Sequence, residues 1–142
     1  MTTPRPAEPD RAASPRPCWL WLWGPVILYA VIIFGLSSAS DLPPLPPRIT
    51  DKMAHIALYS GLGFLLARAL AGGFGRSVPP WVPPLVVLLA LLYGVSDEIH
   101  QLFVPRRTFD YFDMVADAVG AGLGAGALWL WGIISRPGDA LR

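Results

Sequence analysis

The chain has 142 residues, enough for one domain, and 54% of them are hydrophobic whereas only 15% are charged. This composition excludes a typical soluble domain and is typical of a protein that resides in a lipid bilayer. The formal net charge is +1 and the basic residues are spread along the chain, which excludes the basic patch of a nucleic-acid-binding protein.

The N-terminal part predicts a tail followed by a first transmembrane helix. Residues 1–16 are rich in proline, alanine and charge, which predicts a disordered cytoplasmic tail. No charge interrupts residues 17–40, and their apolar run extends from Trp19 to Leu36. Arg16, this run and the following Ser-Ser-Ala-Ser resemble a signal peptide, whose apolar core has about 7 to 15 residues. The run is longer, so a retained helix is favoured and cleavage is the alternative.

A second helix is expected after a proline-rich connector. The prolines of residues 41–48 predict an extended segment because they cannot continue a helix. Thr50 is the expected N-cap, and the helix should run to Leu70. His55 near its start and Arg68 near its end shorten the apolar centre. We expect both polar groups to reach the membrane interfaces.

Two further helices complete the predicted membrane domain, which spans residues 17–135. The third is expected from near Pro84 to Leu102, because residues 77–96 carry no charge. After a loop or short re-entrant turn, the fourth should run from about Asp110 to Ile134, and residues 136–142 form a short C-terminal tail. The predicted fold class is therefore all-α, an integral membrane bundle of four transmembrane helices.

Small residues recur at four-residue spacing in two of the predicted helices, which allows close helix packing in membranes. They are Gly63, Ala67 and Ala71 in the second helix, and Ala116, Gly120 and Gly124 in the fourth. The sequence leaves open whether this packing occurs within one chain or between two chains, so a homo-oligomer is one expectation.

The distribution of basic residues predicts the orientation in the membrane. With the N-terminus inside, the inner side holds Arg5, Arg11, Arg16, Arg68, Arg76, Arg136 and Arg142, and the outer side holds Arg48, Lys52, Arg106 and Arg107. This excess on the inner side favours both termini inside. Most of the acidic residues then lie on the outer side of the membrane.

Three of the predicted helices carry a polar stripe at that outer end. The stripes are Asp51, His55 and Tyr59; Asp97, His100 and Gln101; and Asp110, Asp113 and Asp117. Their spacing of three or four residues places the members of each stripe on one helix face. Since the stripes lie at the same depth, we expect them to form one polar pocket under the outer surface.

Several roles are open for such a pocket. Unpaired charges there cost about 2 to 4 kcal/mol each, so a structural network of ion pairs is one interpretation. Another is binding of a polar group from the membrane surface, with Arg107 and Lys52 as anion contacts. No metal or other cofactor is predicted, because no HExxH or CxxC spacing occurs. An ion pathway is disfavoured because no polar residues continue along the inner halves of the helices.

Three segments together resemble the VanZ-like family of small bacterial membrane proteins. They are residues 37–38 (SS), 51–64 (DKMAHIALYSGLGF) and 93–124 (YGVSDEIHQLFVPRRTFDYFDMVADAVGAGLG). The family's recurring polar positions fall on Asp51, Lys52, His55, Tyr59, Glu98, Gln101, Arg107, Asp113 and Asp117. Arg106 stands where glycine is usual, which puts a tight turn at this position in doubt.

The resemblance implies a multi-pass protein of the bacterial plasma membrane, in a family whose named member gives resistance to the glycopeptide teicoplanin. The expected partners are the bilayer and an anionic envelope lipid or a glycopeptide. The expected binding residues are Asp51, Lys52, His55, Tyr59, Asp97, Glu98, Gln101, Arg107, Asp113 and Asp117. The alternative is a membrane enzyme that acts on a lipid headgroup, with His55 as its acid–base catalyst.

Overall fold

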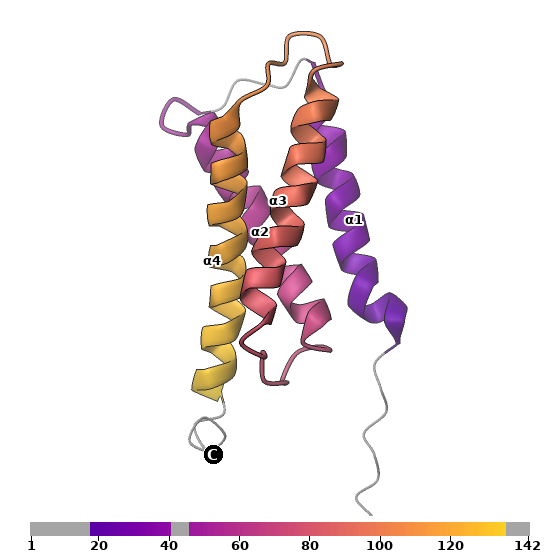
Figure 1. Ribbon diagram of the computed structural model, residues 1–142, viewed down its shortest axis with the longest axis vertical. Coiled ribbons are helices and arrows are strands. Elements are labelled where there is room, and N and C mark those ends of the chain that lie inside the picture. Colours follow the sequence, from indigo (N-terminus) through magenta and orange to yellow (C-terminus); the bar gives the residue numbers. More distant parts are fainter. Residues whose placement is uncertain (1–17, 41–45, 136–142) are drawn as a thin grey trace, which may run out of the picture.

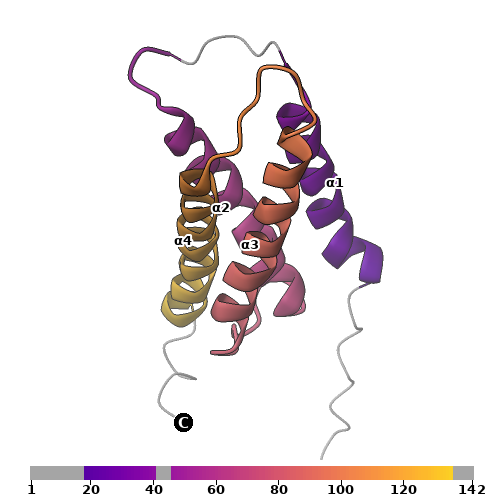
Figure 2. The same ribbon diagram turned by 45° about the horizontal axis from the view of Figure 1, so that its top comes forward.

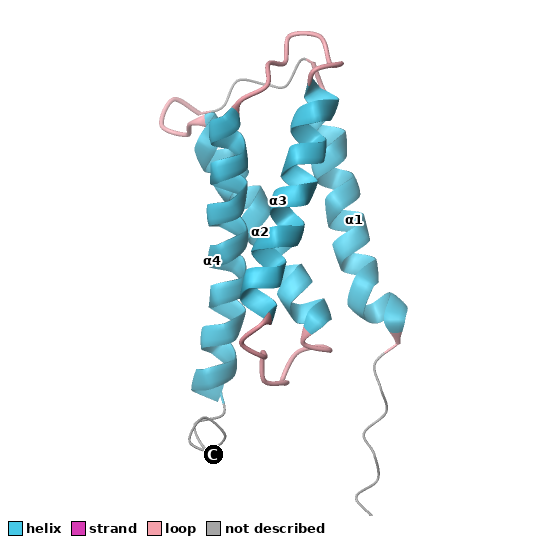
Figure 3. Cartoon of the chain, in the orientation of Figure 1, coloured by secondary structure: helices cyan, strands magenta, loops and turns pink. Residues whose placement is uncertain are grey.

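The structure, a computed structural model, describes residues 18–40 and 46–135. The tails predicted at residues 1–16 and 136–142 lie outside the described residues, as does the start of the proline-rich connector. The helices are α1 (Trp19–Ser37), α2 (Asp51–Leu70), α3 (Val82–Gln101) and α4 (Tyr111–Ser135). Each is long and apolar enough to cross a membrane, and no strand occurs among the described residues (Figure 3). The predicted all-α bundle of four transmembrane helices is confirmed.

Helices α2, α3 and α4 pack together, whereas α1 lies against α2 and α3 on the side away from α4 (Figure 1). The view turned by 45° shows the same arrangement (Figure 2). Few side chains of α1 are buried, namely Val26, Ile33 and Ser37. We call the end of the bundle where α1 and α3 finish and α2 and α4 begin the polar end. Residues 46–50, which precede α2, and the α3–α4 loop lie there (Figure 1).

The small residues of α2 and α4 face each other within the chain. A Cβ atom added to Gly120 would lie 2.5 Å from the Ile56 carbonyl oxygen, and one added to Gly63 would lie 2.6 Å from Ala121 Cα. At Gly124 it would meet the backbone of α2 in the same way. These glycines therefore allow the backbones to approach closely. They serve this intrachain contact, which leaves the expected homo-oligomer without support from these positions.

The helix ends agree with the sequence to within two residues. The Thr50 hydroxyl caps α2 by accepting a hydrogen bond from the Met53 amide, at 3.3 Å. Helix α3 starts at Val82, earlier than expected, because its prolines occupy the first turn, where an amide has no intrahelical partner anyway. Helix α4 starts at Tyr111, so Asp110 precedes it.

Arg68, near the end of α2, is buried against α1, and its depth in a membrane stays a prediction. Its side chain is 3% exposed and donates hydrogen bonds to the Trp21 carbonyl from both terminal nitrogens, each at 3.1 Å. In a regular helix the amide of residue 25 would bond to this carbonyl, but Pro25 has no amide hydrogen. The guanidinium also lies over the rings of Trp21 and Phe74. Arg68 thus supplies the donor that Pro25 lacks and holds α1 against α2.

Candidate functional site

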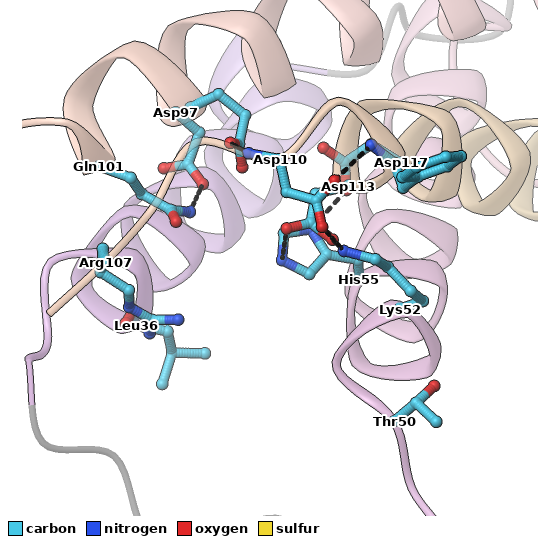
Figure 4. Close-up of polar contacts among 12 residues, drawn as sticks. Leu36, Thr50, Lys52, His55, Asp97, Gln101, Arg107, Asp110, Asp113 and Asp117 are labelled. Carbon is cyan, nitrogen blue, oxygen red and sulfur yellow. Dashed lines mark hydrogen bonds and ion pairs between the residues drawn. The ribbon is translucent and has the colours of Figure 1, made fainter.

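Charged side chains from α2 and α4 form an ion-pair cluster at the polar end (Figure 4). Lys52 pairs with Asp110 at 2.5 Å and with Asp113. The hydrogen bond from Lys52 lowers the pKa of the Asp110 carboxyl below its ordinary value, and the bond from the Phe112 amide adds to this. Lys52 therefore pairs with two carboxylates at once, as expected for charges that lie near the membrane.

A buried carboxylate orients His55 beside that cluster. His55 Nδ1 lies 2.8 Å from Asp117 Oδ1, and Asp117 is 1% exposed. Because an ionised carboxylate can only accept, Nδ1 donates this bond, and Nε2 is turned toward Asp113 Oδ2 at 3.8 Å. Asp117 fits because its neighbour on α3 is Gly94, where an added Cβ would lie 2.5 Å from Asp117 Oδ2. The hydrogen bond between α2 and α4 thus depends on the absence of a side chain at Gly94.

Two acidic residues at the end of α3 are only partly satisfied. Gln101 donates to Asp97 Oδ2 at 3.2 Å, and the Asp110 amide donates to Glu98 Oε2 at 2.8 Å. Asp97 Oδ1 and Glu98 Oε1 are buried and have no hydrogen-bond partner within the described part of the chain. Such atoms are rare in native proteins and call for an explanation.

A cavity of about 910 Å³ opens at the polar end between α1, α2 and the end of α3. The expected site residues divide between its wall and the cluster behind it. Its wall includes Asp51, His55, Tyr59, Asp97, Gln101 and Arg107. The remaining expected residues, Lys52, Glu98, Asp113 and Asp117, do not line it. Lys52 in particular is held by carboxylates, so we assign it no anion contact.

The cavity wall is mostly apolar, with polar groups at defined positions. Helices α1 and α2 contribute its aliphatic part, which includes Ile33, Leu36, Met53 and Leu58. The hydroxyls of Ser37 and Tyr59 belong to wall residues, are buried and have no hydrogen-bond partner among the described residues, although Tyr59 lies near Asp117. A large apolar cavity with a few convergent polar groups is typical of a ligand site.

The loop between α3 and α4 places two arginines at the cavity. Arg106 and Arg107 both line it, and Arg107 Nη2 donates to the Leu36 carbonyl at 3.4 Å. Arg106 has φ of 66°, the left-handed conformation that glycine adopts most readily. The turn that the sequence put in doubt is therefore present, although an arginine occupies it.

Some residues of this site were not expected from the sequence. Gly94 and Ser37 lie in segments that carry the family resemblance, but neither was expected at the site, because a glycine within a helix and a serine at a helix end are common. Asp110 belonged to an expected stripe but not to the expected site. His100 turns away from Asp97, since its Nε2 lies 3.0 Å from Ser38 Oγ and its ring lies against Phe34.

One group of side chains could hold a metal ion. The donor atoms of Asp51, His55 and Asp113 all lie within 4.8 Å of one another. The sequence predicted no metal because the motif spacings are absent, and that prediction remains untested.

The family resemblance seen in the sequence agrees with a family profile. The profile of the VanZ/LLP1 family matches residues 22–132, which include all four helices almost completely. The chain belongs to this family. The VanZ/LLP1 match includes every residue of the cavity wall and of the ion-pair cluster.

The chain is also similar to an uncharacterised protein of the fission yeast Schizosaccharomyces pombe. The two are 28% identical over 96 residues, which are 68% of this chain and 57% of the yeast protein. This chain thus matches just over half of that relative's length. Because the relative is eukaryotic, the similarity does not by itself place the chain in a bacterium. No solved structure matches the chain.

Proposed function

We propose that this VanZ/LLP1 protein binds one amphipathic envelope lipid with an anionic headgroup in the cavity between α1, α2 and α3. The observation that carries the proposal is the set of buried polar atoms without partners: Ser37 Oγ, Tyr59 Oη and Asp97 Oδ1, all from cavity-wall residues. Leaving such groups unsatisfied costs about 1 to 3 kcal/mol each. A polar headgroup would supply the missing hydrogen bonds.

The shape and charge of the wall support a lipid as the ligand. The aliphatic side chains Ile33, Leu36 and Leu58 suit an acyl or prenyl chain. Arg106 and Arg107 lie on the wall, and planar guanidinium groups bind phosphate with two parallel hydrogen bonds. The other carboxylates of the polar end do not line the cavity, so its wall has two arginines, Arg106 and Arg107, and two aspartates, Asp51 and Asp97.

The same proposal places the protein in a bacterial plasma membrane with both termini inside. The uneven distribution of arginine and lysine supports this orientation. The cavity then opens to the outer leaflet, where envelope lipids and glycopeptides meet the membrane. A contribution to teicoplanin resistance would follow if the bound lipid is one that such glycopeptides need, or if the glycopeptide itself enters the cavity.

Two tyrosines provide the test. The Tyr59 hydroxyl lies near Asp117 but makes no direct hydrogen bond among the described residues, whereas Tyr93 Oη donates to the Ala30 carbonyl at 2.7 Å. Tyr59→Phe should leave the melting temperature unchanged and weaken binding of a phosphate-headgroup lipid about tenfold, as one lost hydrogen bond predicts. Tyr93→Phe should cost about 0.5 to 1.5 kcal/mol of stability and leave binding unchanged.

The measurement is lipid binding by native mass spectrometry, with melting followed in parallel. Phosphatidylglycerol, undecaprenyl phosphate, an uncharged diacylglycerol and teicoplanin serve as separate ligands. Equal affinity of Tyr59→Phe and wild type for every ligand would contradict the proposal. Preference for teicoplanin over both phosphate lipids would replace the lipid by the glycopeptide as the ligand.

A second candidate function is an enzyme that acts on a lipid headgroup. The pair of His55 and Asp117 favours it, since a carboxylate that orients an imidazole is a common acid–base arrangement and His55 lines the cavity. This candidate predicts that purified protein converts a lipid phosphate or ester and that His55→Gln abolishes turnover while lipid binding remains. Unchanged lipids after prolonged incubation would exclude it for the substrates tested.

A further inference from the structure

The polar end brings together three side chains that can each bind a metal ion. We infer that Asp51, His55 and Asp113 bind a divalent transition-metal ion of the Zn²⁺ type. Their donor atoms, one imidazole nitrogen and two carboxylate oxygens, come from α2 and α4 and lie within 4.8 Å of one another. This donor set is typical of Zn²⁺ and related ions.

The imidazole is oriented for this role. Asp117 holds Nδ1 of His55 at 2.8 Å, so the proton lies on Nδ1 and the neutral ring presents its lone pair at Nε2. Nε2 faces Asp113 Oδ2 at 3.8 Å, which is too far for a hydrogen bond. With the proton on Nδ1, the Nε2 lone pair and Asp113 Oδ2 face each other, and a divalent cation can bind between these two donor atoms. Metal-binding histidines almost always donate their second nitrogen to a carboxylate or carbonyl in this way.

The two oxygens of Asp113 have different partners. Oδ1 accepts from Lys52, whereas Oδ2 is the atom turned toward His55. Lys52 thus fixes the carboxylate without covering its second oxygen. Asp113 is 4% exposed, and its rigid setting suits a ligand that must keep a defined geometry.

Asp51 completes the set from the cavity side. It precedes His55 by four residues, so both side chains lie on one face of α2, and both line the cavity. Three protein ligands leave a coordination position open, as in catalytic zinc sites. Because Asp51 and His55 belong to the wall, that position faces the cavity.

The metal also removes a difficulty of the proposed function. A wall with two aspartates holds an anionic headgroup more readily if a divalent ion offsets their charge and accepts a phosphate oxygen. This consequence rests on the proposed lipid binding, whereas the metal site itself stands without it.

The test uses the full chain in detergent, purified without a histidine tag and stripped with a chelator. Cys18 is exposed and is a thiol, so all variants carry Cys18→Ser to exclude binding there. Zn²⁺ content after dialysis is measured by elemental mass spectrometry, and Co²⁺ is added as an absorbing probe. Neither measurement includes lipid, so its outcome is independent of the proposed function.

We expect a single ion per wild-type chain and an absorption band of four- or five-coordinate Co²⁺. His55→Gln and Asp51→Asn should lose the ion. Asp117→Asn should weaken the affinity for the ion about 10- to 100-fold, because the His55 imidazole is no longer held in place. His100→Gln is the matched control and should bind as wild type does, because His100 contacts Ser38 instead.

Asp51 is exposed, so Asp51→Asn should fold even if a His55 variant does not. A wild-type chain that retains no stoichiometric Zn²⁺ or Co²⁺ overturns the inference. So does an Asp51→Asn chain that binds the ion as tightly as His100→Gln does.

Discussion

At the scale of single residues, the polar end depends on the absence of a side chain at Gly94 as well as on its charged groups. Asp117 can bind His55 because Gly94 has no side chain. A Cβ atom added to Gly94 would lie 2.5 Å from Asp117 Oδ2 and would leave the carboxylate no room. Arg106 occupies a left-handed turn that a glycine would adopt without strain. Sequence reasoning placed Asp117 and His55 in one polar pocket without pairing them. It could not identify Gly94, because a missing side chain has no pattern of its own.

This arrangement predicts the effect of Gly94→Ala. Alanine normally stabilises a helix interior by about 1 kcal/mol relative to glycine. At Gly94 the methyl group would displace Asp117 from His55, and we expect a net loss of about 1 to 3 kcal/mol from overpacking. The control is Gly126→Ala on α4, where an added Cβ meets nothing within 4 Å. Melting in detergent measures both, and equal stability of the two variants would show that Asp117 has room to move.

At the scale of the elements, each helix carries one feature that decides how it is placed. Glycines bring α4 against α2, whereas α1 has no polar stripe and is held through its backbone carbonyls, which accept from Arg68, Tyr93 and Arg107. The charge-free runs predicted the helices themselves to within a few residues, because a span needs about 20 apolar residues whatever its neighbours are. They could not predict the position of α1, since an evenly apolar helix has no face that indicates a partner.

The attachment of α1 predicts a coupling between Arg68 and Pro25. Arg68→Leu should cost about 1.5 to 3 kcal/mol, because it removes hydrogen bonds from a charged donor to the Trp21 carbonyl. In a Pro25→Ala background, the amide of residue 25 can donate to the Trp21 carbonyl. Arg68→Leu should therefore cost clearly less stability in that background. A double-mutant cycle of unfolding free energies measures the difference. Equal costs in both backgrounds would mean that the Trp21 carbonyl does not need Arg68.

At the scale of the whole molecule, the fold gathers charge at one end and encloses a cavity beside it. The polar stripes allowed this gathering to be predicted, since side chains at one depth on packed helices must meet. They did not reveal which charges would pair. Lys52 was expected to bind an anion, yet it pairs with Asp110, just before α4, and with Asp113 in its first turn. The cavity itself depends on how far α1 stands from α2, which no local pattern encodes.

The central claim is that this cavity holds a lipid, and filling it is the most direct test. Ala57 lines the cavity from α2 and its side chain is exposed, so Ala57→Trp should occupy the space without disturbing the core. The measurement is native mass spectrometry of the chain released directly from membranes. The account predicts a single phosphate-containing lipid on wild type and its loss from Ala57→Trp at unchanged melting temperature. The same lipid at the same occupancy on both chains would contradict it.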